Sequence, residues 1–201
     1  MAASPPLPLP RDLAGTRVLL GGVELPLHFV SESQINAIVP YGLSLNANKD
    51  LLVIRGSALS VPEPVSIAAA QPAVFTQTQT GSGQGHVYIF VSPTLSVLAD
   101  SARPAKAGDV LTLWCAGLGE VSPPVEAGAA GPVPVSEAVN TLKVTIGGKD
   151  ATVAFRGLAP GFAGLYQVNV VVPSGITPGN AVPVVLTIAG QQGPPVTIAV
   201  Q

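Results

Sequence analysis

The chain has 201 residues and a formal net charge of −2, and only 10% of its residues are charged. This excludes the clusters of Lys and Arg with which proteins bind nucleic acid or anionic membrane surfaces. Gly (22) and Pro (21) are abundant, but the hydrophobic share of 47% is enough for a buried core. No apolar run reaches the ~18 residues that cross a bilayer, and the N-terminus has neither the basic region nor the apolar run of a signal peptide.

The sequence predicts an all-β fold. No window of about 12 residues has apolar positions at helical spacing without a Pro or Gly break. Short β-branched runs alternate with turn residues instead, as in sandwiches. In chain order, the predicted strands are Thr16–Leu20, Glu24–Val30, Gln34–Val39, Asp50–Arg55, Val65–Ala69, His86–Val91, Val110–Ala116, Thr141–Ile146, Ala151–Arg156, Leu165–Val172, Val182–Ala189 and Pro195–Val200.

An internal repeat is the most informative feature of the sequence. Four ordered segments recur at offsets of 126, 133, 134 and 131 residues, with one seven-residue insertion in the second copy, at 157–164. The matching pairs are Val18-Leu-Leu-Gly-Gly22 with Val144-Thr-Ile-Gly-Gly148, Gln34-Ile-Asn-Ala-Ile-Val-Pro40 with Gln167-Val-Asn-Val-Val-Val-Pro173, Leu52-Val-Ile-Arg-Gly56 with Leu186-Thr-Ile-Ala-Gly190, and Val65-Ser-Ile-Ala68 with Val196-Thr-Ile-Ala199. Each Gly-Gly pair predicts a tight hairpin turn.

The repeat predicts two homologous β-modules, residues 1–72 and 73–201. The second has two further strands, His86–Val91 and Val110–Ala116, ahead of its Gly-Gly hairpin. The first has only the Pro-rich segment Met1–Leu13 there, so we expect it to lack its opening strands and to expose an edge. Docking on the second module, dimerisation or strands from upstream sequence would each cover that edge.

Several segments resemble the uncharacterised Solibacter-type C-terminal domain of large exported bacterial proteins. They are Gln34-Ile-Asn-Ala-Ile-Val-Pro-Tyr41, Gln71-Pro-Ala-Val-Phe75, Gly81-Ser-Gly-Gln-Gly85, Pro104-Ala-Lys-Ala-Gly-Asp-Val-Leu-Thr-Leu113, Gly117-Leu-Gly119 and Gly157-Leu-Ala-Pro-Gly-Phe-Ala-Gly-Leu-Tyr-Gln-Val-Asn169. The resemblance covers about 9–200 and implies an extracellular or cell-surface location, with no established activity. Two departures are the missing opening strand of the first module and a short, apolar segment at 85–101.

A looser similarity is to immunoglobulin-like TIG modules. The stretch Gly108–Gly119 resembles their opening strand and turn, and Gly164–Val168 resembles strand F of immunoglobulin-like sandwiches. This similarity implies a tyrosine-corner hydrogen bond from Tyr166, but none in the first module, where Ser33 takes its place. The expected fold is therefore two tandem immunoglobulin-like β-sandwich modules, the first incomplete.

Three aromatic residues are candidate ligand contacts. Trp114 is predicted on the outer face of its strand, opposite Leu111, Leu113 and Cys115, and with Tyr88 it could stack on a sugar ring. Burial of Trp114 against the first module is the favoured alternative. Phe162 lies in the insertion loop, where it either carries function or, as we favour, plugs the end of the sandwich.

The paired amides Gln34/Asn36 and Gln167/Asn169 each share one strand face. A polar ligand face is one interpretation, but their presence in both modules favours hydrogen bonds to neighbouring loop backbone.

No catalytic or metal site is predicted. The single Cys115 excludes an internal disulfide and falls at a core-facing position, which indicates a buried hydrophobe. Ser82 lacks the strand and helix of a nucleophile elbow. The acidic residues show no calcium-binding spacing, and no cofactor is implied.

The predicted function is a non-catalytic accessory module of an exported protein, acting as spacer, surface attachment or protein interaction domain. A carbohydrate-binding module is the first alternative. The second is strand-mediated assembly through the open edge, including homodimerisation. The predicted partner is a protein or a cell-surface polysaccharide.

Overall fold

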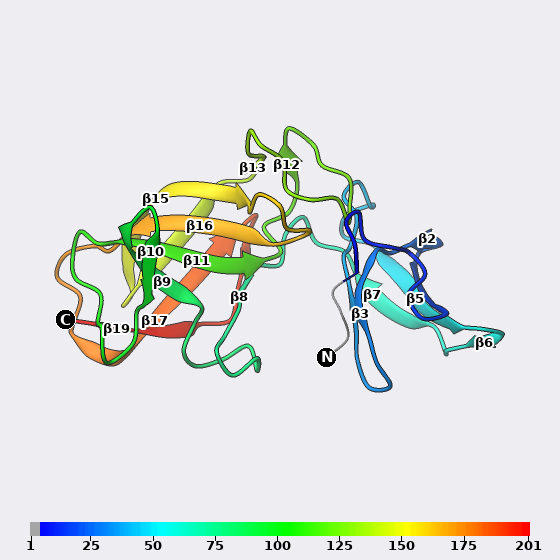
Figure 1. Cartoon of the computed structure of the whole chain (residues 1–201), viewed down its shortest axis with the longest axis horizontal. Coiled ribbons are helices and arrows are strands. Elements are labelled where there is room, and N and C mark those ends of the chain that lie inside the picture. Colours follow the sequence, from blue (N-terminus) through cyan, green and yellow to red (C-terminus); the bar gives the residue numbers. More distant parts are fainter. Residues whose placement is uncertain (1–4) are drawn as a thin grey trace.

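The computed structural model describes residues 5–201. The fold is all-β, with 0% helix and 49% of residues in strands, and its ladders are antiparallel. This confirms the predicted fold class. Figure 1 shows the strands in two groups, β1–β7 on the right and β8–β19 on the left. Among the described residues no strand of one group pairs with a strand of the other, so we call them the first and the second unit.

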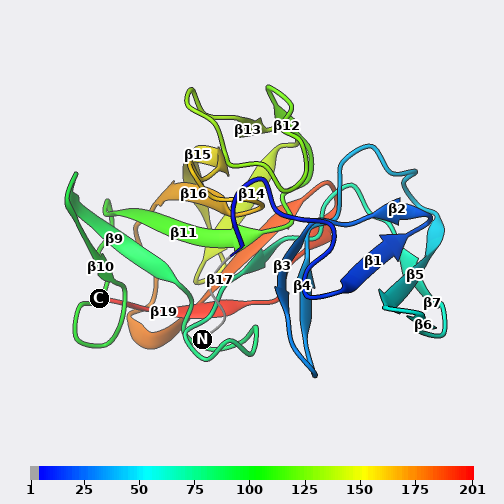
Figure 2. The ribbon, with the colours of Figure 1, turned by 45° about the vertical axis from the view of Figure 1, so that its right-hand side comes forward.

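The first unit has two small sheets. One has the order β2-β1-β5-β6 with β7 also on β5, and the other is the hairpin β3-β4. The strands are β1 (Thr16–Leu20), β2 (Val23–Glu24), β3 (Leu27–Val30), β4 (Ile35–Ala37), β5 (Asn48–Arg55), β6 (Ala58–Leu59) and β7 (Glu63–Ser66). Figure 2 shows β3 and β4 running side by side as a ribbon of their own.

The second unit has the strand order β10-β9-β11-β16-β15-β14-β17-β18, with β8 on β11, β13 on β12 and β15, and β19 on β17. The strands are β8 (Ala73–Val74), β9 (Val87–Ser92), β10 (Leu95–Leu98), β11 (Val110–Ala116), β12 (Val121–Ser122), β13 (Glu137–Ala138), β14 (Leu142–Ile146), β15 (Lys149–Leu158), β16 (Tyr166–Val171), β17 (Gly179–Ile188), β18 (Gln191–Gln192) and β19 (Val196–Val200). The ten-residue β15 pairs with β14 at its start and β16 at its end. It therefore connects the part of the sheet that contains β14 and β17 with the part that contains β16 and β11.

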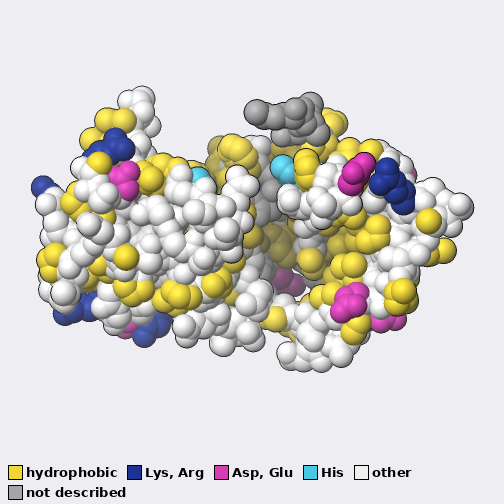
Figure 3. Space-filling view, turned by 90° about the horizontal axis from the view of Figure 1, so that it is seen from below, with side chains coloured by type: hydrophobic (Ala, Val, Ile, Leu, Met, Phe, Trp, Pro, Cys, Tyr) yellow, Lys and Arg dark blue, Asp and Glu magenta, His cyan; other side chains and the backbone are white. Residues whose placement is uncertain are grey.

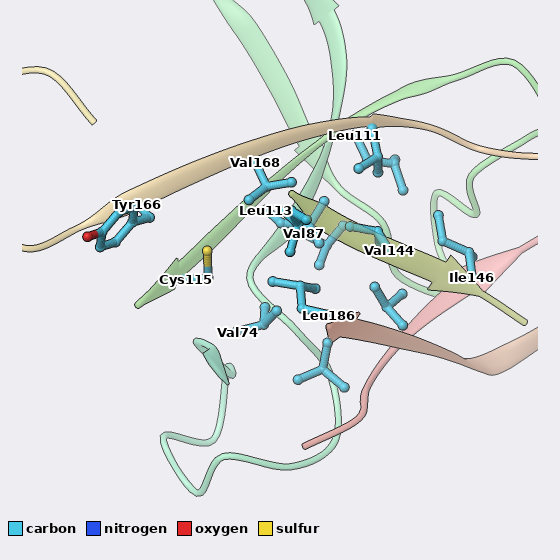
Figure 4. Packing of buried hydrophobic residues seen from close by; sticks show 14 of the residues in the cluster. Val74, Val87, Leu111, Leu113, Cys115, Val144, Ile146, Tyr166, Val168 and Leu186 are labelled. Carbon is cyan, nitrogen blue, oxygen red and sulfur yellow. The ribbon is translucent and has the colours of Figure 1, made fainter. Parts of the chain in front are cut away.

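The core of the second unit follows from the alternation of its strands. On β11 the residues Leu111, Leu113 and Cys115 are fully buried, as predicted from period 2. Figure 4 shows them facing Val144 of β14 and Leu186 of β17 across the interior. Burying these aliphatic side chains is the main source of stability in this unit.

The two units repeat the same pairing scheme. In both, a strand followed by a Gly-Gly turn pairs with two neighbours: β1 with β2 and β5, and β14 with β15 and β17. The register between β3 and β4 shifts between Leu27 and Phe29, and the register between β15 and β16 shifts at the equivalent point, between Val153 and Phe155. The internal repeat is therefore a repeat of structure as well as of sequence.

Strand pairing also corrects the alignment of the later repeats. Val18 pairs with Val53, while its equivalent Val144 pairs with Leu186, so the offset between β5 and β17 is 186 − 53 = 133. The offset of 134 from the sequence match is wrong by one residue. The offset of 131 for the last match is wrong too, because Leu51 pairs with Glu63 where Val184 pairs with Val196, which gives 133.

Most predicted strands form with shifted ends, and β1 and β11 form with the predicted bounds. The predicted strand Glu24–Val30 is wrong as one element, because Pro26 separates β2 from β3. Proline has no amide hydrogen for the ladder, and its fixed φ bends the chain. The segment 85–101 holds an additional strand, β10, which pairs with β9. The two-residue strands β6, β8, β12, β13 and β18 were not predicted.

Candidate functional site

The first unit has an open sheet edge at β4. In the second unit the equivalent strand β16 lies between β15 and β11. In the first unit β4 pairs with β3 alone, and no described residue pairs with its other side. An edge of this kind presents unpaired amide and carbonyl groups that a further strand can bind.

Side chains in and just after β4 are more exposed than the equivalent side chains in and just after β16. The inward residues of the second copy, Val168, Val170 and Val172, are 0%, 0% and 2% exposed. Their equivalents at an offset of 133 are Ile35, Ala37 and Val39. Ile35 is half-buried, Ala37 is exposed, and Val39 is 51% exposed.

A groove of about 410 Å³ runs beside this edge, between the two units. Most of its walls are apolar. The lining residues are 37–43, Leu45, 65–71, Ala116, Gly117, Gly119, Glu120, Gly164 and Tyr166. Figure 3 shows hydrophobic side chains gathered around a hollow on the first unit, at the right of that view. We call the groove lined by these residues the inter-unit groove.

The groove overlaps the place that the start of β11 and the segment before it fill in the second unit, because its lining includes Ala37 and Val39, the equivalents of Val170 and Val172. Val65 on its wall is half-buried, whereas its equivalent at an offset of 133, Ile198, is 0% exposed. Ile67 and its equivalent Val200 are both buried, at 8% and 5% exposed. In the second unit, Ala105 bridges to Val200.

The other side of this space is formed by β4, which corresponds to β16, the strand that pairs with β11 in the second unit. Leu111 of β11 pairs with Val170, the counterpart of Ala37. The described residues of the first unit supply no counterpart of Ala105 or Leu111.

Two tyrosines join the units at one end of the groove. The hydroxyls of Tyr41 and Tyr166 lie 2.7 Å apart, and the Tyr166 hydroxyl donates to the carbonyl oxygen of Gly119 at 2.5 Å. Since Tyr166 uses its proton on Gly119, Tyr41 is the donor to the Tyr166 oxygen. Burial raises the pKa of both phenols above the ordinary value of 10.0. The predicted tyrosine corner is therefore wrong about the acceptor, because Tyr166 bonds to the backbone of a distant loop and not to a carbonyl a few residues upstream.

Glycines let the linker between the units lie against the loop after β11. Gln71 N donates to Gly117 O at 2.8 Å. A Cβ at Gly117 would come within 1.9 Å of the Gln71 carbonyl oxygen, and one at Gly119 within 2.3 Å of that of Ala69. Both glycines have positive φ, so a side chain is excluded by backbone conformation as well as by space.

The paired amides bond to each other rather than to loop backbone, so the favoured interpretation is wrong about the partner. Gln34 Nε2 donates to Asn36 Oδ1 at 2.7 Å, and Gln167 Nε2 donates to Asn169 Oδ1 at 3.0 Å. The two units differ in one contact. Asn169 Oδ1 also accepts from Thr112 Oγ1 on β11, at 3.2 Å.

The structure places Tyr88 and Trp114 on one outer sheet face. Thr112 pairs with Tyr88 on one side, and Trp114 pairs with Gln167 on the other. Tyr88 and Trp114 are half-buried. His86 stacks on Tyr88 with ring centroids 6.1 Å apart and hydrogen-bonds to its hydroxyl. The strand partners of Trp114 belong to the second unit.

Phe162 does not belong to this face. It lies in the loop between β15 and β16 and is 57% exposed, so the expectation that it plugs the sandwich is wrong. Gly164 of the same loop makes the close approach to the first unit, where a Cβ would come within 2.7 Å of Ile38 Cδ1. The backbone of the loop, rather than its aromatic side chain, packs at the junction.

Reactive groups do not converge in the described part of the chain. Cys115 is fully buried, and burial raises the pKa of its thiol. No three His, Cys, Asp or Glu side chains among residues 5–201 gather as metal ligands. Nor does any helix of this range have the length and apolar character to span a membrane.

An all-β protein with two topologically repeated units, one of them open at an edge, is the class that this geometry defines. No family model, curated protein or solved structure matches the chain. Its function is therefore inferred from the groove and the sheet faces themselves.

Proposed function

We propose that the chain is a protein-interaction module of an exported bacterial protein and that the inter-unit groove is its binding surface. One observation carries the proposal: residues 35, 37 and 39, in and just after β4, are exposed or half-buried, whereas their equivalents in and just after β16 are 0–2% exposed. Apolar surface left open beside an unpaired strand is typical of protein interaction sites. The exported, bacterial setting rests on the family resemblance.

The chemistry of the groove favours an apolar polypeptide over a reacting substrate. Glu120 is the only charged side chain among the lining residues. The two phenols, Tyr41 and Tyr166, hold their protons more tightly than usual and already hydrogen-bond to each other. General acid–base catalysis needs a group that titrates near the working pH, and burial moves both phenols away from it.

Selection from a displayed library of random peptides tests the proposal. The intact chain is the target. Val39→Lys places a charge on the groove wall, and Val139→Lys places the same charge on the second unit at a residue of similar exposure, 57% against 51%. We expect enriched peptides that bind the parent chain and Val139→Lys but lose binding to Val39→Lys. A selection that enriches no peptide with this dependence on Val39 contradicts the proposal.

A second candidate function, carbohydrate binding, is favoured by the outer face of β9, β11 and β16. It combines Tyr88 and Trp114 with the amides of Gln167 and Asn169, and sugars bind to such surfaces of flat rings and polar groups. Trp114→Ala is expected to remove binding to polysaccharide while leaving the fold intact. Depletion assays with insoluble and soluble polysaccharides, followed by Trp fluorescence, test this, and absence of binding by the parent chain contradicts it.

A further inference from the structure

We propose that the occupant of the inter-unit groove is an extended strand of a separate polypeptide, paired antiparallel to β4. It would take the place on β4 that β11 takes on β16. This inference rests on the proposed function and specifies the binding mode, the register and the side-chain pattern of the partner. Each of these follows from the equivalence of the two units.

The backbone of β4 is free on the required side. Ile38 N donates to Pro26 O, toward the β3 side, and the Gln34 carbonyl accepts from Ser31 N on that same side. Alternate residues of a strand direct their amides to opposite sides. The amides of residues 35, 37 and 39 therefore point to the open edge, as those of 168, 170 and 172 point toward β11.

The register of the partner can be read from the second unit. Leu111 pairs with Val170 and Leu113 with Val168, so an equivalent strand places one apolar residue opposite Ala37 and the next opposite Ile35. Both leucines are fully buried where they stand. In the first unit, the exposed Ala37 and Val39 and the groove leave space for such side chains. The partner thus has large apolar residues at alternate positions.

One polar position of the partner is specified as well. Thr112 donates to Asn169 Oδ1, while the equivalent Asn36 Oδ1 accepts only from Gln34 among the described residues. A carboxamide oxygen can accept two hydrogen bonds. A Thr or Ser between the two apolar residues would complete the bond that Asn36 leaves open.

A second copy of the chain is a poorer occupant than a separate polypeptide. Its β11 has the required pattern but is paired on both sides, with β16 and with β8 and β9, and its leucines are buried. Releasing it would open the core of the second unit.

Residues 109–117 of this chain, made as a synthetic peptide with Cys115→Ser, are the probe. The peptide is titrated into the intact 201-residue chain by isothermal calorimetry. Two N-methylated forms are matched controls for the pairing. Methylation at Leu111 and Leu113 blocks the amides that face β16 in the native ladder, whereas methylation at Thr112 and Trp114 blocks those that face the other way, since Trp114 N donates to His86 O.

We expect the unmodified peptide to bind one to one and the form methylated at Thr112 and Trp114 to bind similarly. The form methylated at Leu111 and Leu113 should bind roughly tenfold more weakly or worse, because two backbone hydrogen bonds are lost. On the protein, Ala37→Pro removes one outward amide and should weaken binding. Ala37→Val keeps the amide and should not. If Ala37→Pro fails to fold, the methylated peptides still decide the question.

The possible results separate this inference from the proposed function. Equal binding of both methylated forms overturns strand pairing but leaves the groove as a peptide site. Failure of the peptide to bind, while the library yields peptides dependent on Val39, overturns the predicted pattern alone. A library without such peptides overturns the proposed function itself. Light scattering that shows a dimer lost in Ala37→Pro makes a second copy the occupant and overturns the separate partner.

Discussion

The hydroxyl of Tyr41, which directly follows the repeated segment Gln34–Pro40 in the first unit, lies 2.7 Å from the hydroxyl of Tyr166 on β16 in the second. Tyr166 is in turn bonded to Gly119 O, so a chain of two hydrogen bonds crosses the junction. Tyr166 is buried and Tyr41 is half-buried, and a buried polar group is costly when it loses its partner. The pair therefore couples the stability of the units.

A double-mutant cycle measures this coupling. Tyr41→Phe removes the donor to the Tyr166 oxygen and should lower the free energy of unfolding by about 1 kcal/mol. Tyr166→Phe also leaves Gly119 O without its donor and should cost about 1–3 kcal/mol. Because the two changes remove one shared bond, the double variant should lose less than the sum. Urea unfolding of the four proteins gives the values, and strict additivity would contradict the coupling.

High pH should weaken the same junction. The pKa of Tyr41 is raised above the unfolded value of 10.0, chiefly by burial and further by the negative charge of Glu120, although its bond to Tyr166 acts the other way. A raised pKa means that the folded state holds the proton more tightly. This contribution to stability is complete below pH 10 and is lost as the pH rises through the folded pKa. Unfolding free energies measured between pH 8 and about 11.5 should fall at the upper end.

The double variant Tyr41→Phe/Tyr166→Phe is the control for this titration. It lacks both phenols, so its free energy of unfolding should fall less steeply above pH 10. Identical slopes for the parent and the double variant would show that other groups carry the pH dependence.

The sequence predicts the local strands well because period 2 and β-branched runs are local features. The alternation of Leu111, Leu113 and Cys115 was enough to assign the buried face of β11. The two Gly-Gly hairpin turns are also predictable from sequence, because both glycines of each pair adopt positive φ. The break at Pro26 was missed, although a proline within a predicted strand is itself evidence against a continuous ladder.

The sequence predicts that the first module has an open edge, but it does not predict which strand forms that edge. The repeat indicated an open edge in the first module. The strand that forms it is shown only by pairing, because sequence matching does not say which side of β4 is unpaired. The Tyr41–Tyr166 contact spans 125 residues. No local pattern encodes such a pair, since the docking of the two units brings the phenols together.

Two equivalent valines that follow β4 and β16 should respond very differently to truncation. Val172 is 2% exposed and Val39 is 51% exposed, although the repeat places them at the same position. Val172→Ala should cost about 1–3 kcal/mol, through lost transfer energy and the cavity left behind. Val39→Ala should change the free energy of unfolding by less than about 0.5 kcal/mol. Equal losses in urea unfolding would mean that Val39 is buried in solution, for instance by association.

When the strand peptide is bound, truncation of Val39 should reduce stability, as truncation of Val172 does without peptide. Bound peptide stabilises the folded state according to its affinity. A Val39→Ala variant that binds the peptide less tightly would therefore gain less from it. The shift in melting temperature at fixed peptide concentration is the measurement, and equal shifts for the parent and Val39→Ala would place the peptide elsewhere.

The close approach of the linker to the loop after β11 should make Gly117 intolerant of any side chain. Gly117 and Gly148 have nearly the same φ, 76° and 78°, but a Cβ at Gly148 meets no atom within 4 Å, while one at Gly117 collides with the carbonyl of Gln71. Gly148→Ala should cost about 1 kcal/mol from left-handed strain alone. Gly117→Ala should cost about 3 kcal/mol or more, because the linker must also move. Thermal unfolding of the two variants isolates the contribution of the clash. Equal losses would show that the linker does not lie against this loop in solution.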